Sequence, residues 1–286
     1  MGYLNQPITN AINNLNNRQR ARSVSTFDFS TLYTKIPHDK LLFVLNSLVD
    51  FCFKGGVSKY IAIKKSKACW VVHPFKDCMV FGKLSIKAGV KYLMENCYFN
   101  LGNKIFRQII GITMGSDPAP FFAKWFLYYY ESKWLKNVQR SDLRRARKFP
   151  NTFRFIDDLV AISDGGEFEK SFHEIYPAEM ELGKENDGTN STSFLDLEIS
   201  ITDNKFKLSL YDKRDGFPFS IVRMPYRSSN MPSMIFYSAI GVEILRIAKA
   251  TSIVDTFLVS VRSLVIRLIK QGAKIAKTAK VLQISE

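Results

Sequence analysis

Acidic residues inside two apolar segments limit what this chain can fold into more than any other feature of its sequence. Asp28 lies between two phenylalanines in a stretch that alternates as a β-strand does. Far downstream, Asp157 and Asp158 lie between apolar neighbours in a second segment, residues 152–162. A carboxylate in such surroundings is costly unless it lies at the end of a strand or binds a cation. We therefore consider the hypothesis that these acids form a cation site.

Three carboxylates on two such segments suit a pair of divalent cations. Oxygen ligands of this kind select Mg²⁺ or Mn²⁺. Two such ions about 3.5–4 Å apart assist in-line phosphoryl displacement, one at the attacking hydroxyl and one at the leaving pyrophosphate. Each segment alone is a weak signal, because a strand Asp is more often structural and Asp pairs are common in turns. Together they indicate a template-directed polymerase.

The charge of the chain agrees with a polyanionic partner. Its 41 Lys and Arg against 26 Asp and Glu give a net charge of +15, a balance that also suits an anionic membrane surface. The uncharged run of residues 228–242 is shorter than the roughly 18 residues of a spanning helix, and Asn230 and Pro232 interrupt it. The N-terminus lacks the pattern of a signal peptide. We therefore expect neither membrane insertion nor secretion.

The cysteines and histidines do not predict a zinc site. The chain has four cysteines and three histidines, and no two cysteines stand in a Cys-x-x-Cys pair. We expect free thiols in a reducing compartment.

The remaining pattern predicts strands interleaved with long helices, which is typical of an α+β fold. We expect a strand over 23–30, a hairpin over 152–162, and a second hairpin of residues 195–201 and 206–210 around a turn at 202–204. We expect helices over 37–53, 121–148, 167–176 and 233–283. Residues 1–22 are Asn-rich and then basic, and we expect them to form a loose lead-in with room for one short helix. Residues 57–107 show the least clear pattern of helices and strands.

Three ordered motifs resemble those of reverse transcriptases of the Penelope-like retroelement type. Residues 27–37 (Phe-Asp-Phe-Ser-Thr-Leu-Tyr-Thr-Lys-Ile-Pro) resemble motif A, residues 111–120 (Gly-Ile-Thr-Met-Gly-Ser-Asp-Pro-Ala-Pro) motif B, and residues 154–159 (Arg-Phe-Ile-Asp-Asp-Leu) motif C, and the likeness continues through 194–198 and 211–215 to Arg246. The resemblance implies a reverse-transcriptase palm with a primer-grip hairpin over 23–232 and a helical thumb-like segment over 233–286. Residues 1–22 would be a basic lead-in or a remnant of the fingers.

The same resemblance implies the chemistry and its participants. Asp28 and Asp157, with the backbone carbonyl of Phe29, would chelate two Mg²⁺ (or Mn²⁺) ions, and Asp158 would be an accessory ligand. An RNA template, a DNA primer and a dNTP are the implied partners. The primer 3′-hydroxyl would attack the α-phosphate of the dNTP, and pyrophosphate would leave.

Further residues stand at positions that the family uses for the nucleotide. Tyr33 would be the steric gate against the ribose 2′-OH, with packing in the core as the alternative. Gly115 and Ser116 would let the backbone approach the template and the incoming base. Met114 stands where many reverse transcriptases have Gln, as is common in the Penelope-like group. Lys184 would protonate pyrophosphate, with a solvated surface lysine as the alternative.

A basic stretch and the basic C-terminal helices would contact the phosphates of the template–primer duplex. The residues of this stretch are Arg140, Arg144, Arg145, Arg147 and Lys148. A solvated helix face is the alternative.

The sequence also departs from the family pattern. Residues 1–27 are too few for a fingers subdomain, no GIY-YIG endonuclease follows, and Phe155 replaces the usual Tyr of motif C. A second hypothesis is therefore a catalytically inactive, nucleic-acid-binding remnant of such an element. A third, an RNA-dependent RNA polymerase, is disfavoured by Tyr33 and by the overall resemblance. The use of genomic DNA by such elements implies a nuclear location.

Overall fold

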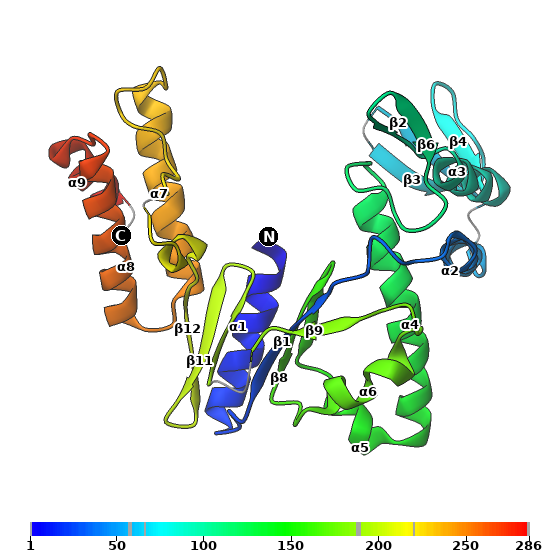
Figure 1. Cartoon of the computed structure of the whole chain (residues 1–286), viewed down its shortest axis with the longest axis horizontal. Coiled ribbons are helices and arrows are strands. Elements are labelled where there is room, and N and C mark those ends of the chain that lie inside the picture. The colour runs from blue at the N-terminus through cyan, green and yellow to red at the C-terminus, as the bar shows by residue number, and fades with distance from the viewer. Residues whose placement is uncertain (1, 57–58, 66, 187–189, 220, 285–286) are drawn as a thin grey trace. The chain divides into compact units, whose positions relative to one another are not determined.

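The chain folds into two compact units built from helices and antiparallel sheets. The computed structural model describes residues 2–56, 59–65, 67–186, 190–219 and 221–284. The predicted α+β fold is confirmed in these ranges (Figure 1). The first unit comprises residues 1–27, 148–166 and 184–286, and the second unit comprises residues 28–147 and 167–183. The division runs through strands β1 (Val24–Phe29) and β9 (Leu182–Lys184).

The first unit contains two sheets, the N-terminal helix and the C-terminal helices. Its elements are α1 (Gly2–Asn17), the first part of β1, β7 (Thr152–Phe155), β8 (Asp158–Ile162), β10 (Ser191–Phe194), β11 (Leu197–Thr202), β12 (Lys205–Leu210), η1 (Lys213–Gly216), α7 (Ser233–Ala250), α8 (Val254–Lys270) and α9 (Ile275–Ile284). The strand orders are β7-β8-β1-β9 and β10-β11-β12. The two hairpins and the helices after residue 233 are therefore confirmed.

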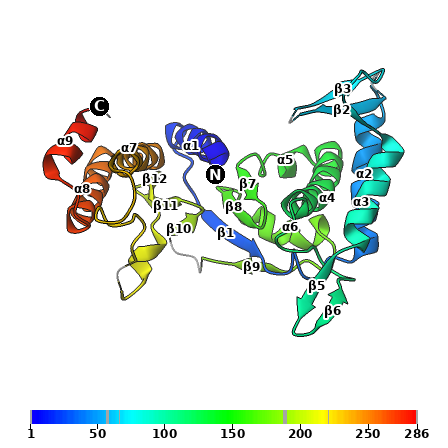
Figure 2. The same ribbon diagram turned by 90° about the horizontal axis from the view of Figure 1, so that it is seen from above.

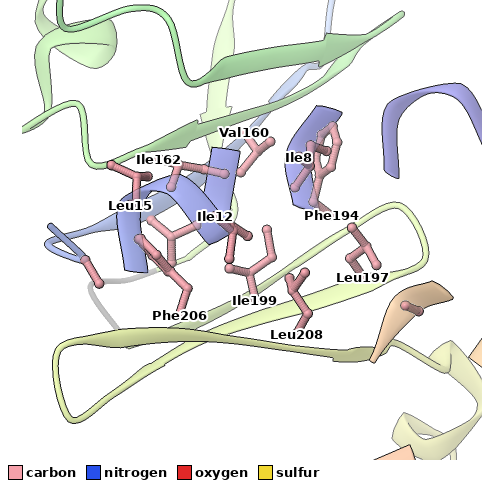
Figure 3. Close-up of a cluster of buried hydrophobic side chains, with 13 residues drawn as sticks. Ile8, Ile12, Leu15, Val160, Ile162, Phe194, Leu197, Ile199, Phe206 and Leu208 are labelled. Atoms are coloured by element: carbon pink, nitrogen blue, oxygen red, sulfur yellow. The ribbon is translucent and has the colours of Figure 1, made fainter. Parts of the chain in front are cut away.

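Helix α1 is a core element and not the loose lead-in that we expected. Ile8, Ile12 and Leu15 are buried at helical spacing. Figure 3 shows these side chains between strand β8 and the β11–β12 hairpin. The Asn16 side chain also donates to the backbone oxygen of Phe206 (2.9 Å) and accepts from its N–H (2.7 Å). The Asn-rich composition hid a stripe that buries apolar area and fixes the edge strand β12.

The C-terminal helices share a separate cluster of buried side chains. Phe236, Ile240 and Ile244 of α7 are nearly fully buried, and Leu268 of α8 packs into the same cluster. The spacing of the α7 residues is that of one helix face. The hydroxyl of Tyr237 accepts the backbone N–H of Lys274 (3.0 Å), just before α9 begins. This contact connects the start of the last helix to α7.

The second unit contains α4, the longest of the described helices, together with shorter helices and two small sheets. Its elements are α2 (His38–Phe53), β2 (Tyr60–Lys64), β3 (Lys67–Val71), β4 (Met79–Gly82), α3 (Lys83–Glu95), β5 (Tyr98–Leu101), β6 (Lys104–Arg107), α4 (Ala119–Ser141), α5 (Leu143–Ala146) and α6 (Glu167–Ile175). One antiparallel sheet has the order β3-β2-β4, and β5 pairs with β6 alone. Helices α2 and α3 run beside each other, as Figure 2 shows. The predicted helices over 37–53 and 167–176 are confirmed.

The long helix that we expected over 121–148 is interrupted near its end. Helix α4 ends at Ser141, and Asp142 has the extended backbone of a cap (φ −143°). The Asp142 carboxylate accepts the N–H of Arg145 (3.0 Å), which starts the short helix α5. Asp142, which the sequence pattern places inside the long helix, is therefore the N-cap of α5.

Two simpler expectations can be compared directly with the structure. All four cysteines are free. Among the described residues, no helix is both long and apolar enough to span a membrane.

Candidate functional site

Strand β1 presents Asp28 between two buried aromatic rings. Phe27 and Phe29 are 2% and 3% exposed, while Asp28 is half-buried. The Phe29 ring packs on Phe172 (5.9 Å between centroids) and Tyr176 (5.0 Å). Because the neighbouring rings are buried, the Asp28 carboxylate emerges from a strand whose backbone is well fixed.

The turn after β1 is fixed by a buried threonine. The Thr31 hydroxyl donates to the backbone oxygen of Glu179 (3.1 Å) and accepts the N–H of Glu181 (3.0 Å). Tyr33 lies in this turn with a half-buried side chain. Its role as a steric gate stays a prediction, and full burial in the core does not occur.

Gly111 brings the predicted motif B against the predicted motif A. Its φ is +81°, and a Cβ there would lie 2.4 Å from the carbonyl oxygen of Tyr33. The N–H of Ile112 donates to that same oxygen (2.8 Å), and the N–H of Gly111 donates to Ile36 (2.8 Å). The close approach therefore requires glycine. Sequence reasoning quoted Gly111 in the motif without recognising this contact, although glycine at the start of a turn was the available signal.

The rest of the motif B loop is ordered by its own side chains. Thr113 donates its hydroxyl to Gln108 (2.7 Å), and the Ser116 hydroxyl donates to the backbone oxygen of Thr113 (3.0 Å). Gly115 has φ +95° and open space where a Cβ would lie, and Met114 is 71% exposed. The Gly115 backbone is therefore open to a ligand, which agrees with its predicted role without testing it.

A small pocket borders this loop inside the second unit. Its volume is about 230 Å³, and its wall combines apolar side chains from α2, α3 and α4 with a few polar groups. The polar groups include His38, whose Nε2 lies 2.8 Å from the carbonyl oxygen of Gly111. This contact ties the start of α2 to the motif B loop.

The Asp pair lies on the tight β7–β8 hairpin. Phe155 pairs with Asp158, which leaves Ile156 and Asp157 as a two-residue loop. Ile156 has φ +58°, where two-residue hairpins favour glycine and a β-branched residue is an outlier. Such strain costs about 1–3 kcal/mol and is concentrated at functional sites. The Arg154 guanidinium donates to the Ile156 carbonyl (2.9 Å) and secures the turn.

Asp157 has the surroundings expected of a metal ligand. Its side chain is half-buried at the hairpin tip, and within the described ranges it has neither a hydrogen-bond partner nor an ion pair. A divalent cation would supply the partner that this carboxylate lacks. Carboxylate oxygens such as those of Asp157 and Asp158 are the kind of donor that Mg²⁺ and Mn²⁺ prefer.

The structure describes these three acids in two units. Asp28 belongs to the second unit, while Asp157 and Asp158 belong to the first. Among the residues described, no three His, Cys, Asp or Glu side chains gather as a metal-binding group. The complete ligand set, including the carbonyl of Phe29, therefore stays a prediction.

Lys184 lies against strand β1 at the end of β9. Its ammonium is 5.9 Å from the ring centroid of Phe27, the residue before Asp28. The side chain is exposed. This position agrees with both alternatives, a proton donor near the acids and a surface lysine.

Arg145 differs from the rest of the predicted phosphate-binding stretch. It donates to Glu167 and Glu174 (2.8 Å each) and stacks on Trp134 at 5.4 Å. The hydrogen bonds with Glu174 and Glu167 raise the pKa of Arg145 above its ordinary value. Two carboxylates of the second unit already pair with the charge of Arg145. Contact with phosphates stays a prediction, and it suits the exposed residues of the basic stretch better than it suits Arg145. These are Arg140, Arg144, Arg147 and Lys148.

A charged cluster that the sequence analysis missed connects the segment around η1 to helix α8. Asp212 accepts hydrogen bonds from Arg214 (2.7 Å) and from Arg267 of α8 (3.3 Å). The Arg214 guanidinium, assisted by Arg267, lowers the pKa of Asp212 to about 2. Arg214 is only two residues from Asp212, but Arg267 is 55 residues away in sequence, so no local pattern could have shown that this arginine joins the pair.

Comparison with known proteins identifies the fold. No protein-family model and no curated protein matches the chain. Among solved structures, the chain is similar to apo telomerase from Candida tropicalis, with 14% identity over 100% of this chain and 48% of that one and a TM-score of 0.53. It is also similar to telomerase from Candida albicans, solved in complex with a fragment of telomeric RNA, with 13% identity over 85% of this chain and 39% of that one and a TM-score of 0.56. The chain thus spans less than half the length of each, and it shares the fold of the matched part of these telomerases.

Proposed function

We propose that this chain is the palm and thumb of an RNA-directed DNA polymerase of the Penelope-like type. The observation that carries the proposal is Asp157, a half-buried carboxylate without a partner among the described residues, on a strained turn. The shared telomerase fold supports a nucleic-acid polymerase. The motifs at residues 27–37, 111–120 and 154–159 support the Penelope-like assignment. Use of genomic DNA as primer would place the protein in the nucleus.

The acids would position the reacting groups, because phosphoryl transfer depends mostly on positioning and charge neutralisation. Asp28, the Phe29 carbonyl and Asp157 would hold two Mg²⁺ (or Mn²⁺) ions, with Asp158 as an accessory ligand. The ions would lower the pKa of the primer 3′-hydroxyl and neutralise the charge on the leaving pyrophosphate. Strand β1 and the β7–β8 hairpin supply the fixed backbones that such positioning requires.

The motif A and motif B segments would bind the dNTP. The Ile112 N–H fixes the backbone carbonyl of Tyr33, and the ring of Tyr33 would exclude a ribose 2′-OH. The open backbone at Gly115 and the Ser116 hydroxyl would contact the incoming nucleotide and the template base. Lys184 would donate a proton to pyrophosphate.

Primer extension on poly(rA)/oligo(dT) with dTTP and Mg²⁺ or Mn²⁺ tests the proposal. Asp157→Asn should abolish incorporation while thermal unfolding shows an intact fold. Asp203→Asn makes the same change at an exposed hairpin turn of the same unit and should leave incorporation unchanged. Normal incorporation by a folded Asp157→Asn protein would refute the assignment.

Two other outcomes identify the alternatives. Duplex binding with no extension by the native chain indicates the nucleic-acid-binding remnant. Preference for rNTPs over dNTPs indicates an RNA-dependent RNA polymerase.

A further inference from the structure

The β5–β6 hairpin exposes an unusual amount of apolar surface. Every residue of both strands is exposed. Its large apolar side chains are 41% to 73% exposed, and they are Tyr98 (56%), Phe99 (48%), Leu101 (67%), Ile105 (73%) and Phe106 (41%). Figure 2 shows the hairpin projecting from the helices of the second unit. Contiguous exposed apolar surface marks a binding site more often than chance exposure does.

The hairpin also lacks the support that such a structure normally needs. Its two strands pair with each other and with no third strand among those described. A two-stranded hairpin alone is at best marginally stable in water. A bound partner that covers its side chains would therefore stabilise it.

Each face of the hairpin combines an aromatic ring with a cation. The register puts Phe99 opposite Phe106, and Leu101 opposite Lys104 at the next position of the same face. The two phenylalanine rings are stacked, 5.7 Å apart and 20° from parallel. The opposite face pairs Tyr98 with Arg107. Stacking rings interleaved with cations are what single-stranded nucleic acid binds.

The charge of the segment favours nucleic acid over a protein partner. No Asp or Glu occurs from Asn96 to Ser116. Within the described ranges, neither Lys104 nor Arg107 has an ion-pair partner. Both cations therefore remain available to phosphates.

The hairpin leads directly into the motif B loop. The N–H of Gln108, the residue after β6, donates to the carbonyl oxygen of Cys97 just before β5 (2.9 Å). The Gln108 side chain then donates to the Ile110 carbonyl (2.8 Å) and accepts the Thr113 hydroxyl (2.7 Å). A strand bound on the hairpin would thus continue toward Gly115, where the template base is expected.

We infer that the β5–β6 hairpin binds single-stranded nucleic acid by base stacking on Phe99, Phe106 and Tyr98 and by phosphate contacts to Lys104 and Arg107. In the polymerase this strand is the unpaired template, a statement that rests on the proposed function. The binding itself does not depend on catalysis.

Binding of a labelled 12-nucleotide single-stranded RNA, without divalent metal or dNTP, tests the inference. Phe99→Ala with Phe106→Ala should weaken binding about 5- to 100-fold, from the typical strength of base–aromatic stacking. The slope of log K against log salt should not change. The control Phe43→Ala with Phe75→Ala removes two exposed phenylalanines of the same unit, 61% and 43% exposed, and should bind normally.

The cations supply a second and independent readout. Lys104→Gln with Arg107→Gln should reduce the salt slope by about 1.4, since each phosphate contact to a single strand contributes about 0.7. These side chains are exposed, so this variant tests the inference even if the aromatic variant fails to fold.

The result that overturns the inference is unchanged single-strand affinity and unchanged salt slope in the folded variants. A shift from dimer to monomer in the aromatic variant, with RNA affinity unchanged, also overturns it and assigns the hairpin to self-association. Because the assay needs no metal and no dNTP, neither result bears on whether the chain polymerises.

Discussion

Replacing Gly111 by alanine tests the contact that connects the two predicted nucleotide-binding segments. The new Cβ would lie 2.4 Å from the Tyr33 carbonyl oxygen and 3.0 Å from that of Thr34. The left-handed backbone costs a residue with a Cβ about 1–2 kcal/mol. Forcing the two backbones apart adds about 1–3 kcal/mol. We therefore expect the second unit to lose about 2–5 kcal/mol of unfolding free energy.

Two other glycines separate these contributions. Gly102 has φ +60° with nothing within 4 Å of a Cβ, so alanine there should cost only the backbone contribution, about 1–2 kcal/mol. Gly89 lies in α3 with open space and no positive φ. Alanine at position 89 should stabilise by about 0.5–1 kcal/mol, because glycine weakens a helix interior.

Tryptophan fluorescence in urea measures the unfolding free energy of the second unit for each variant. The three tryptophans, Trp70, Trp125 and Trp134, all belong to the second unit. With a slope of about 2 kcal/mol per molar urea, the Gly111→Ala midpoint should fall by about 1–2.5 M. A Gly111→Ala midpoint no lower than that of Gly102→Ala would show that the close approach to Tyr33 does not occur.

Two further predictions concern charged clusters. Because Arg214 and Arg267 lower the folded-state pKa of Asp212 from 3.8 to about 2, this acid contributes about 2 kcal/mol of stability above pH 4 that is lost as the pH falls toward 2. Urea unfolding monitored by circular dichroism should show that loss in the native protein and a smaller one in Asp212→Asn; equal losses would contradict the pairing. Arg145→Gln should lower the stability of the second unit with little change in the salt dependence of duplex binding, whereas Arg144→Gln should leave stability unchanged and reduce the salt slope by about 0.9. The opposite pattern in filter binding and thermal unfolding would return Arg145 to the phosphate-binding set.

Local sequence patterns predicted the elements better than the contacts between them. The sequence predicted the helix over 37–53 and the hairpin over 152–162, because proline, glycine and alternating apolar residues mark where these elements begin and end. The sequence left room for only one short helix in residues 1–22, and the length and burial of α1 were missed, since its apolar stripe consists of Ile8, Ile12 and Leu15 among many asparagines. Its stability comes from packing on strands about 150 to 200 residues later in the chain, which no local window contains.

Sequence motifs named the residues of the candidate site, but they could not give the contacts that those residues make. Motif spacing singled out Tyr33 and Gly115, but it could not show that Gly111 meets the Tyr33 carbonyl. The sequence of the basic stretch could not show that carboxylates elsewhere in the fold already pair with Arg145. Arg145 pairs with acids 22 and 29 residues away, and that choice depends on how α5 packs on α6.

The β7–β8 and β10–β11 hairpins of the first unit show why an acid in a turn is ambiguous from sequence. Both place Phe, an aliphatic residue at positive φ, and Asp at the tip: Ile156 has φ +58° and Leu195 has φ +55°. In the second hairpin, the Asp196 carboxylate accepts a hydrogen bond from Arg246 of α7 (3.4 Å). In the first, Asp157 has no such partner in the described part of the chain.

The same local sequence therefore produces a structural acid in one hairpin and a candidate metal ligand in the other. The difference lies in what the rest of the fold brings to each tip. Arg246 of the distant helix α7 satisfies Asp196, while Asp157 lies on a strained turn without a partner of this kind in the described part of the chain. Backbone strain of this kind is concentrated at functional sites, and the divalent cation of the proposed function would be the partner that Asp157 lacks.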